Sequence, residues 1–199
     1  MVLIFTDEQL KELINGNPIG IIFPYDTKNE VEIEAHIRRL YYRIKRIPNI
    51  ICEAEWDHFG SGYASFVEFF CYEMEHVKRV TTPYGIEEVE IEGVLVNISR
   101  LAPVAIFGDD ERSKTIRIET GEEIGGCGGS IMGGYQLENV KDRFQPMIRH
   151  LTNALAEFNY DVLPIELLNQ TLPFKAKIPT IYSEPREYSI ADAIFYWED

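Results

Sequence analysis

One glycine-rich segment places a cysteine where nucleophilic chemistry could occur. Residues 121–134 read GEEIGGCGGSIMGG, so Cys127 has a glycine on each side, and the segment holds half of the 14 glycines in the chain. Glycine lets backbone N–H groups approach a ligand, and such groups could stabilise an oxyanion. A nucleophilic thiol also needs a base within hydrogen-bond reach. No spacing places any of the four histidines beside Cys127, so a loop or hinge is the simpler interpretation of this segment.

The same segment does not match a cofactor-binding or metal-binding motif. It contains neither GxxxxGK[ST] nor a complete GxGxxG, and Glu122 and Glu123 would repel a phosphate. Cys52, Cys71 and Cys127 are widely spaced and form no CxxC pair, so no zinc site is predicted. An odd number of cysteines is also unlike a secreted disulfide framework. We therefore expect no cofactor and no metal, and a reducing, cytoplasmic compartment.

A single carboxylate stands in an apolar stretch. Glu68 lies between Phe66 and Phe70 in a segment that is apolar on both faces. If this face is buried, the pKa of Glu68 would be raised, which is typical of functional carboxylates. The alternative is an ion pair with an arginine from the basic run at 38–46. One function class consistent with these residues is therefore a hydrolase-type enzyme that uses Cys127 or a buried carboxylate such as Glu68.

Two rows of carboxylates alternate along predicted strands. Side chains two residues apart on a strand point the same way, roughly 6–7 Å apart. The alternating positions in these rows are Glu53, Glu55 and Asp57, followed by Glu88, Glu90 and Glu92. If the two rows share one face of a sheet, that face is an acidic field. Such a field could steer a basic protein or bind a divalent metal, or it could simply be a solvated sheet face.

The charge of the whole chain favours a basic partner among the function classes. The formal net charge is −14, and ten of the 33 acidic residues lie between positions 53 and 99, where there are two basic ones. A field of this sign repels nucleic acid and anionic membranes, and no stretch approaches the ~20 apolar residues of a membrane span. Trp56 and other aromatic residues flank the first acidic row, as in many recognition surfaces. The leading hypothesis is an acidic protein-binding domain, for instance an inhibitor or immunity-type protein for a basic partner. A homo-oligomeric scaffold is a lesser alternative.

Hydrophobic periodicity predicts the elements that position these residues. We expect a capped helix at 6–15, a short strand at 19–23, a long helix from about Thr27 to Ile47, and a helix at 136–158 that Pro146 kinks or splits. Strands are predicted at 50–57, 65–75, 87–99, 104–107 and 116–119.

Short connections between these strands favour antiparallel pairing. The prediction is one α+β domain over residues 1–199: an antiparallel sheet of about five strands, packed by two main helices, with an irregular proline-containing C-terminal tail.

Overall fold

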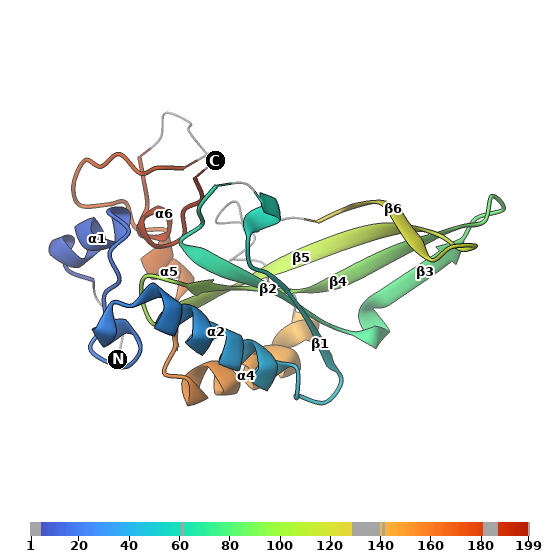
Figure 1. Cartoon of the computed structure of the whole chain (residues 1–199), viewed down its shortest axis with the longest axis horizontal. Coiled ribbons are helices and arrows are strands. Elements are labelled where there is room, and N and C mark those ends of the chain that lie inside the picture. The colour runs from blue at the N-terminus through green and yellow to red at the C-terminus, as the bar shows by residue number, and fades with distance from the viewer. Residues whose placement is uncertain (1–4, 61, 129–139, 141, 181–186, 199) are drawn as a thin grey trace.

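A twisted open sheet is the framework of the molecule, with two long helices on one face and three short helices grouped at one end (Figure 1). The computed structural model describes every residue except 1–4, 61, 129–139, 141, 181–186 and 199. The strands are β1 Ile50–Glu55, β2 Phe66–Glu73, β3 Val77–Thr81, β4 Ile86–Ser99, β5 Val104–Arg117, β6 Glu122–Cys127 and β7 Asp161–Val162. The α-helices in the described part are α1 Asp7–Ile14, α2 Glu30–Ile44, α4 Gln145–Glu157, α5 Ile165–Leu168 and α6 Ile190–Ile194. Short 3₁₀ turns precede α2 and α4 and join β1 to β2 and β2 to β3.

The sheet runs in the order β1-β2-β4-β5-β6, with β3 beside the outer half of β4 and β7 beside the start of β5. All described pairings are antiparallel except that of β7 with β5. The α+β class is therefore confirmed, with seven strands instead of about five.

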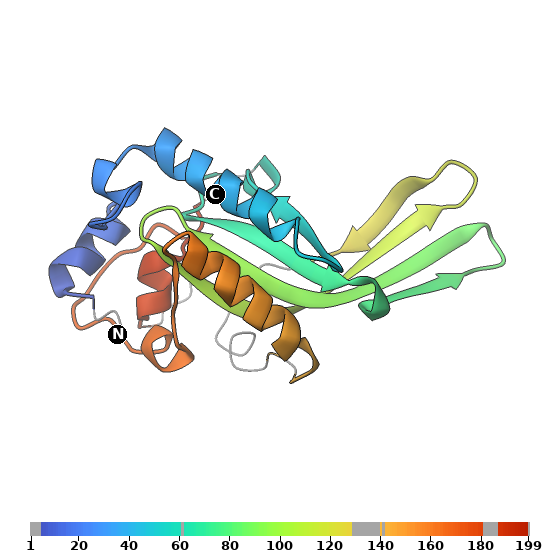
Figure 2. The same cartoon turned by 90° about the horizontal axis from the view of Figure 1, so that it is seen from below.

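The faces of the sheet differ in what covers them. The face that we call the helix face carries Cys52, Phe69, Cys71 and Val94, and α2 and α4 pack on it to form the largest core cluster (Figure 2). A bidentate ion pair ties the two helices together, because Arg43 Nε and Nη2 both lie 2.7 Å from the Glu157 carboxylate. The opposite face, which we call the far face, carries Glu68 and Phe70 of β2 among others.

A second core cluster joins the chain termini to one end of the sheet. Leu101, Val104 and Ile106 pack there against α1, α5 and α6. The Tyr196 hydroxyl donates a hydrogen bond to the Leu13 carbonyl at 3.1 Å, so the last residues of the chain are fastened to α1. The predicted tail thus includes two short helices and the strand β7, and Ser189 caps α6 as its sequence suggests.

At the other end, the sheet continues beyond the helices as a four-stranded extension (Figures 1 and 2). We call it the arm: β3, β6 and the adjoining parts of β4 and β5, residues 86–92 and 111–117. Its own small core lies on the far face and includes Val89 and Ile91 with Phe70 and Leu95. Gly93 stands where β4 enters the arm, and a Cβ there would lie 2.6 Å from the Cys71 carbonyl oxygen. Only glycine fits this close approach.

The first two predicted helices are confirmed with small shifts. Thr6 and Gln9 form the reciprocal hydrogen bonds of a capping box at the start of α1. Helix α2 begins three residues later than predicted, because the side chain of Asn29 accepts from the backbone N–H groups of residues 31 and 32 and caps it there.

Several predicted elements are wrong. Residues 19 and 20 are irregular and residues 21–23 form bends and a turn instead of a strand; among the described residues they join no strand pairing, and Ile21 is 94% exposed. The predicted strand 104–107 and the first two residues of the predicted strand 116–119 belong to one strand, β5, which runs through Gly108 without a turn, and residues 118 and 119 form a turn. Pro146 begins α4 at a position that needs no backbone N–H, so it neither kinks nor splits a helix. The first part of that predicted helix, 136–139, lies outside the described residues.

Two strands of the arm were missed. Residues 122–127 of the glycine-rich segment, predicted as a loop, pair with β5 as strand β6, and Val77–Thr81 pairs with β4 as strand β3. The remainder of the glycine-rich segment, from residue 129, lies outside the described residues.

Candidate functional site

The two predicted acidic rows lie on opposite faces of the sheet, so they do not form one field. Glu53 is directly opposite Phe70 of β2, and Phe70 is directly opposite Leu95 of β4. Side chains alternate along a strand, so Glu53 shares the far face with Leu95, whereas Glu92, three positions away, points to the helix face. The condition for one acidic field is therefore not met. Odd-numbered residues of β1 share a face with odd-numbered residues of β4, whereas one acidic row is odd-numbered and the other even-numbered.

The row on β4 forms an acidic surface on the helix face of the arm. It comprises Glu88, Glu90 and Glu92, and Glu111 of β5 is directly opposite Glu92. Lys78 Nζ lies 3.5 Å from Glu92 and 4.0 Å from Glu90, and Arg143, which precedes α4, pairs with Glu92. Glu88 and Glu111 are exposed, and no described residue forms an ion pair with either. We call these four carboxylates the arm acids.

The predicted residues at the end of β1 are divided among three environments. Glu53 on the far face accepts a hydrogen bond from the Tyr72 hydroxyl at 3.0 Å, and Lys114 Nζ lies 3.5 Å away, so its charge is compensated. Glu55, next on the same face, is half-buried and accepts a hydrogen bond from the backbone N–H of residue 57 at 3.0 Å. Trp56 belongs to the edge of the core, with the Arg38 guanidinium 4.1 Å from its ring centroid.

Asp57 lines a separate cavity of about 380 Å³ near the start of α2. Arg100 projects into this cavity, where its Nη1 lies 3.6 Å from Glu34 and its Nη2 donates to the Trp56 carbonyl at 2.7 Å. The remaining wall combines carboxylate and apolar side chains: Glu30, Val31, Ile33, Tyr63 and Leu101. The cavity could therefore accept a cationic group beside an apolar stem.

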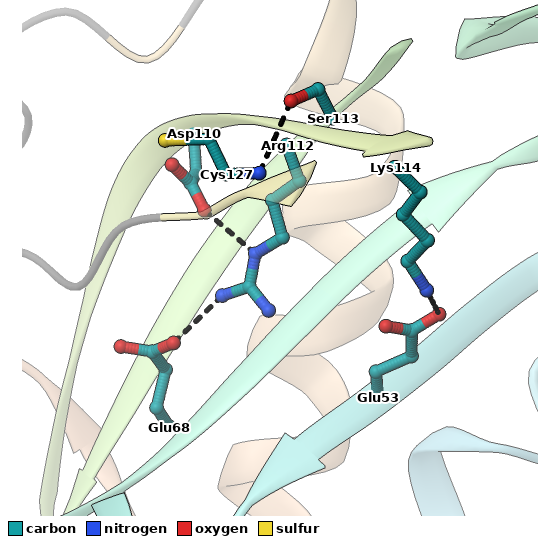
Figure 3. A network of polar contacts seen from close by, with 7 residues as sticks. All are labelled: Glu53, Glu68, Asp110, Arg112, Ser113, Lys114 and Cys127. Atoms are coloured by element: carbon teal, nitrogen blue, oxygen red, sulfur yellow. Dashed lines mark hydrogen bonds and ion pairs between the residues drawn. The ribbon is translucent and has the colours of Figure 1, made fainter. Parts of the chain in front are cut away.

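Glu68 is buried as its apolar neighbours suggest, and it belongs to an ion-pair network (Figure 3). Arg112 Nη2 donates to Glu68 at 2.7 Å, and Arg112 Nε donates to Asp110 at 2.9 Å. The guanidinium also lies 4.1 Å from the centroid of the Phe70 ring. The partner is thus a strand arginine and not one from the basic run of α2, because Glu68 lies on the face of the sheet opposite α2. Two carboxylates around one guanidinium make this a structural charge cluster.

A groove of about 510 Å³ lies beside this network, between β1, β5 and β6. Cys127 lines it, and its backbone N–H donates to Ser113 Oγ at 3.2 Å (Figure 3). The two cations in the lining, Arg112 and Lys114, already have carboxylate partners. No histidine is among the described residues that line the groove, so Cys127 has no imidazole base there.

One further group of potential metal ligands lies in the turn between β2 and β3. Glu73, Glu75 and His76 offer ligand atoms that all lie within 4.8 Å of one another, and the His76 ring contacts Phe144 at 4.9 Å. The sequence pattern ExEH could have revealed this group. Its carboxylates are half-buried or exposed, and such groups often occur without an ion, so we assign it no role.

Sequence reasoning missed the burial of His58, whereas Tyr84 at the tip of the arm is one of the aromatic residues expected beside the acidic strands. His58 is 1% exposed between the rings of Phe66 and Trp197, and burial lowers its pKa to about 4. At the tip, Tyr84 is 88% and Ile118 50% exposed. Alternation of polar and apolar residues gives no signal for the burial of His58.

Comparisons with protein-family models, with curated proteins and with solved structures found no match for this chain. Within the described residues, no helix has the length and apolar character needed to cross a bilayer. The functional argument therefore depends on the geometry of the chain itself.

Proposed function

We propose that this protein is an acidic protein-binding module, of the inhibitor or immunity type, whose arm acids dock onto a basic partner. One observation carries the proposal: Glu88, Glu90, Glu92 and Glu111 share the helix face of the arm, and two of them have no ion-pair partner among the described residues.

The arrangement of these carboxylates costs the isolated protein free energy. Glu92 and Glu111 are directly opposite each other, and like charges at such positions destabilise a sheet by roughly 0.2–1 kcal/mol. Lys78 and Arg143 offset part of this repulsion at Glu92. A lysine- or arginine-rich surface would offset the remainder, and the field of a chain with net charge −14 would speed its approach.

The arm also offers the apolar contacts that a stable interface needs. Its turns come together at the tip, where the backbone N–H of Ile118 donates to the Gly85 carbonyl at 2.9 Å. Tyr84 and Ile118 are exposed there, and Val80 of β3 is 60% exposed. Exposed aromatic residues contribute much of the binding energy in many interfaces, whereas surrounding charges set orientation and association rate.

Charge reversal on the arm tests the proposal. The triple variant E88K/E90K/E111K should no longer retain, at low salt, a basic protein that the wild-type chain captures from its native lysate. The matched control E8K/D26K/E166K changes the net charge equally at exposed positions outside the arm, and it should still capture that protein. Equal loss in both triple variants would mean that net charge alone governs binding. Equal retention in both would remove the arm acids from the interface.

A hydrolase-type enzyme that uses Cys127 or Glu68 is the alternative, and the groove beside Cys127 favours it. An activated thiolate should react with an electrophilic probe at neutral pH at least tenfold faster than a thiol of ordinary pKa. Labelling of Cys127 at the rate of free cysteine would count against the enzyme. The ion pair of Glu68 with Arg112 already assigns that carboxylate a structural role.

A further inference from the structure

Two of the three cysteines are directly opposite each other on neighbouring strands. Cys52 of β1 and Cys71 of β2 are register partners, and both point to the helix face. They are 4% and 0% exposed, and both are free thiols in the core beneath α2. The sequence separation of the pair gave no sign of this contact, which depends on the β1–β2 register.

Sheet geometry places the two sulfur atoms within bonding reach. Directly opposite residues of an antiparallel pair have Cα atoms roughly 4.5–5.5 Å apart, and disulfides span Cα separations of roughly 4.4–6.8 Å. A hydrogen bond with Cys52, together with burial, raises the pKa of Cys71. We propose that Cys52 and Cys71 are the site of a reversible cross-strand disulfide formed by exchange with a low-molecular-weight disulfide such as oxidised glutathione.

The exchange balances in two steps. The Cys52 thiol loses its proton, and the thiolate attacks a sulfur of oxidised glutathione, forming a mixed disulfide and releasing one glutathione thiolate. The Cys71 thiol then loses its proton and attacks Cys52 Sγ, which forms the cross-strand bond and releases the second glutathione thiolate. The protein loses two hydrogens in total, and glutathione disulfide is reduced to two thiols. Cys52 reacts first because it lies on the edge strand and is 4% exposed, whereas Cys71 lies on the inner strand β2 and is 0% exposed.

The position of β1 provides access to these buried thiols. In the described part of the chain β1 pairs with β2 alone, so it is an edge strand of six residues, and fraying it breaks one ladder. Oxidation would then link this edge strand covalently to β2. The disulfide would close a loop over residues 53–70, which includes Asp57 and His58. This inference is independent of the proposed function, because the pair lies in the core and not among the arm acids.

Mass spectrometry of an oxidised protein tests the proposal. The variant C127S removes the exposed thiol and leaves the pair. After incubation with oxidised glutathione, denaturation and alkylation, the intact mass should show the loss of two hydrogens and no alkyl groups, and a proteolytic digest should contain the Cys52–Cys71 cross-link. The midpoint of thermal unfolding should rise by roughly 5–10 °C, and dithiothreitol should reverse the shift.

Single variants provide the control. C52A/C127S and C71A/C127S should each keep one alkylatable thiol or carry one glutathione adduct, with no reversible rise in the midpoint. If either unfolds, C52S/C127S or C71V/C127S replaces it. The proposal is overturned if oxidised C127S remains folded and both thiols are still alkylated after denaturation, or if a glutathione adduct persists at either cysteine without forming the cross-link.

Discussion

The arm and the rest of the molecule, which we call the body, share one sheet, yet they are stabilised in different ways. Seven of the eight residues of β2 in the body are buried, because α2 and α4 cover its helix face, and contacts such as Phe66 with Phe195 and Phe70 with Arg112 cover its far face. All six residues of β6 in the arm are exposed. Backbone hydrogen bonds thus extend strands well beyond the layers that bury them, and β6 in the extension remains exposed.

The largest effect is expected in the body. Phe69→Ala removes a fully buried ring that contacts Tyr41 and Trp56, so the free energy of unfolding should fall by about 3–5 kcal/mol. Urea denaturation followed by tryptophan fluorescence measures the change. A loss below 1 kcal/mol would mean that the helices do not seal this face.

A pH dependence of stability should also originate in the body. Burial, assisted by the charge of Arg100 and opposed by Glu55 and Asp57, lowers the pKa of His58 from its ordinary 6.5 to about 4. Between these two values the unfolded chain binds the proton that folded His58 does not. Stability should therefore decrease by roughly 2–3 kcal/mol as pH falls from about 6.5 to about 4, and level off below.

The variant His58→Asn isolates this contribution. His58 has a φ of +46°, and asparagine tolerates that left-handed conformation better than most residues. Its denaturation curves at pH 7 and pH 4.5 should differ by less than those of the wild-type protein. Identical pH dependence in both proteins would show that His58 titrates as an exposed histidine does.

A smaller effect is expected within the arm. Val89→Ala should cost about 1–2 kcal/mol, because the small arm core surrounds this side chain on one face only. Hydrogen exchange should be faster at amides of β3 and the outer part of β4, with little change in β2. Faster exchange throughout β2 would show that arm and body unfold as one unit.

The smallest effect should follow from the arm acids. E88K/E111K should change the free energy of unfolding by no more than about 0.5 kcal/mol, towards higher stability, because it relieves repulsion among exposed carboxylates. Thermal unfolding at low and high salt measures this. A large loss of stability would mean that the arm acids hold the fold and are not free to bind.

The sequence was sufficient to predict the parts of the fold with strong local signals. The apolar residues of α2 recur at helical spacing, and the capping box of α1 fixes where that helix begins. The continuous apolar run of β2 indicated a strand buried on both faces, which is its position in the sheet. In each case the residues that determine the structure are neighbours in the chain.

The arm could not be predicted in the same way. Gly125 and Gly126 suggest a loop, and Gly108-Asp109-Asp110 suggests a turn, yet pairing with neighbouring strands holds both segments extended. The positions of the candidate site residues depended on how several strands pair with one another. Whether Glu53 and Glu92 share a face is decided by two successive strand registers, and alternation within either strand does not fix them.

The β4–β5 hairpin gives the molecule a mechanical property. Both strands have 14 residues, and thirteen consecutive register pairs run without a shift from Ile86↔Arg117 to Ile98↔Ala105. At about 3.3 Å per residue, the paired part of this hairpin has a length of roughly 45 Å. Because the register is uninterrupted, a force applied at the tip of the arm is transmitted along both strands to the part of β4 and β5 that lies beneath α2 and α4. A force on the arm is therefore resisted by the most deeply buried part of the body. The outer strands β3 and β6 should separate from β4 and β5 before those two strands separate from each other.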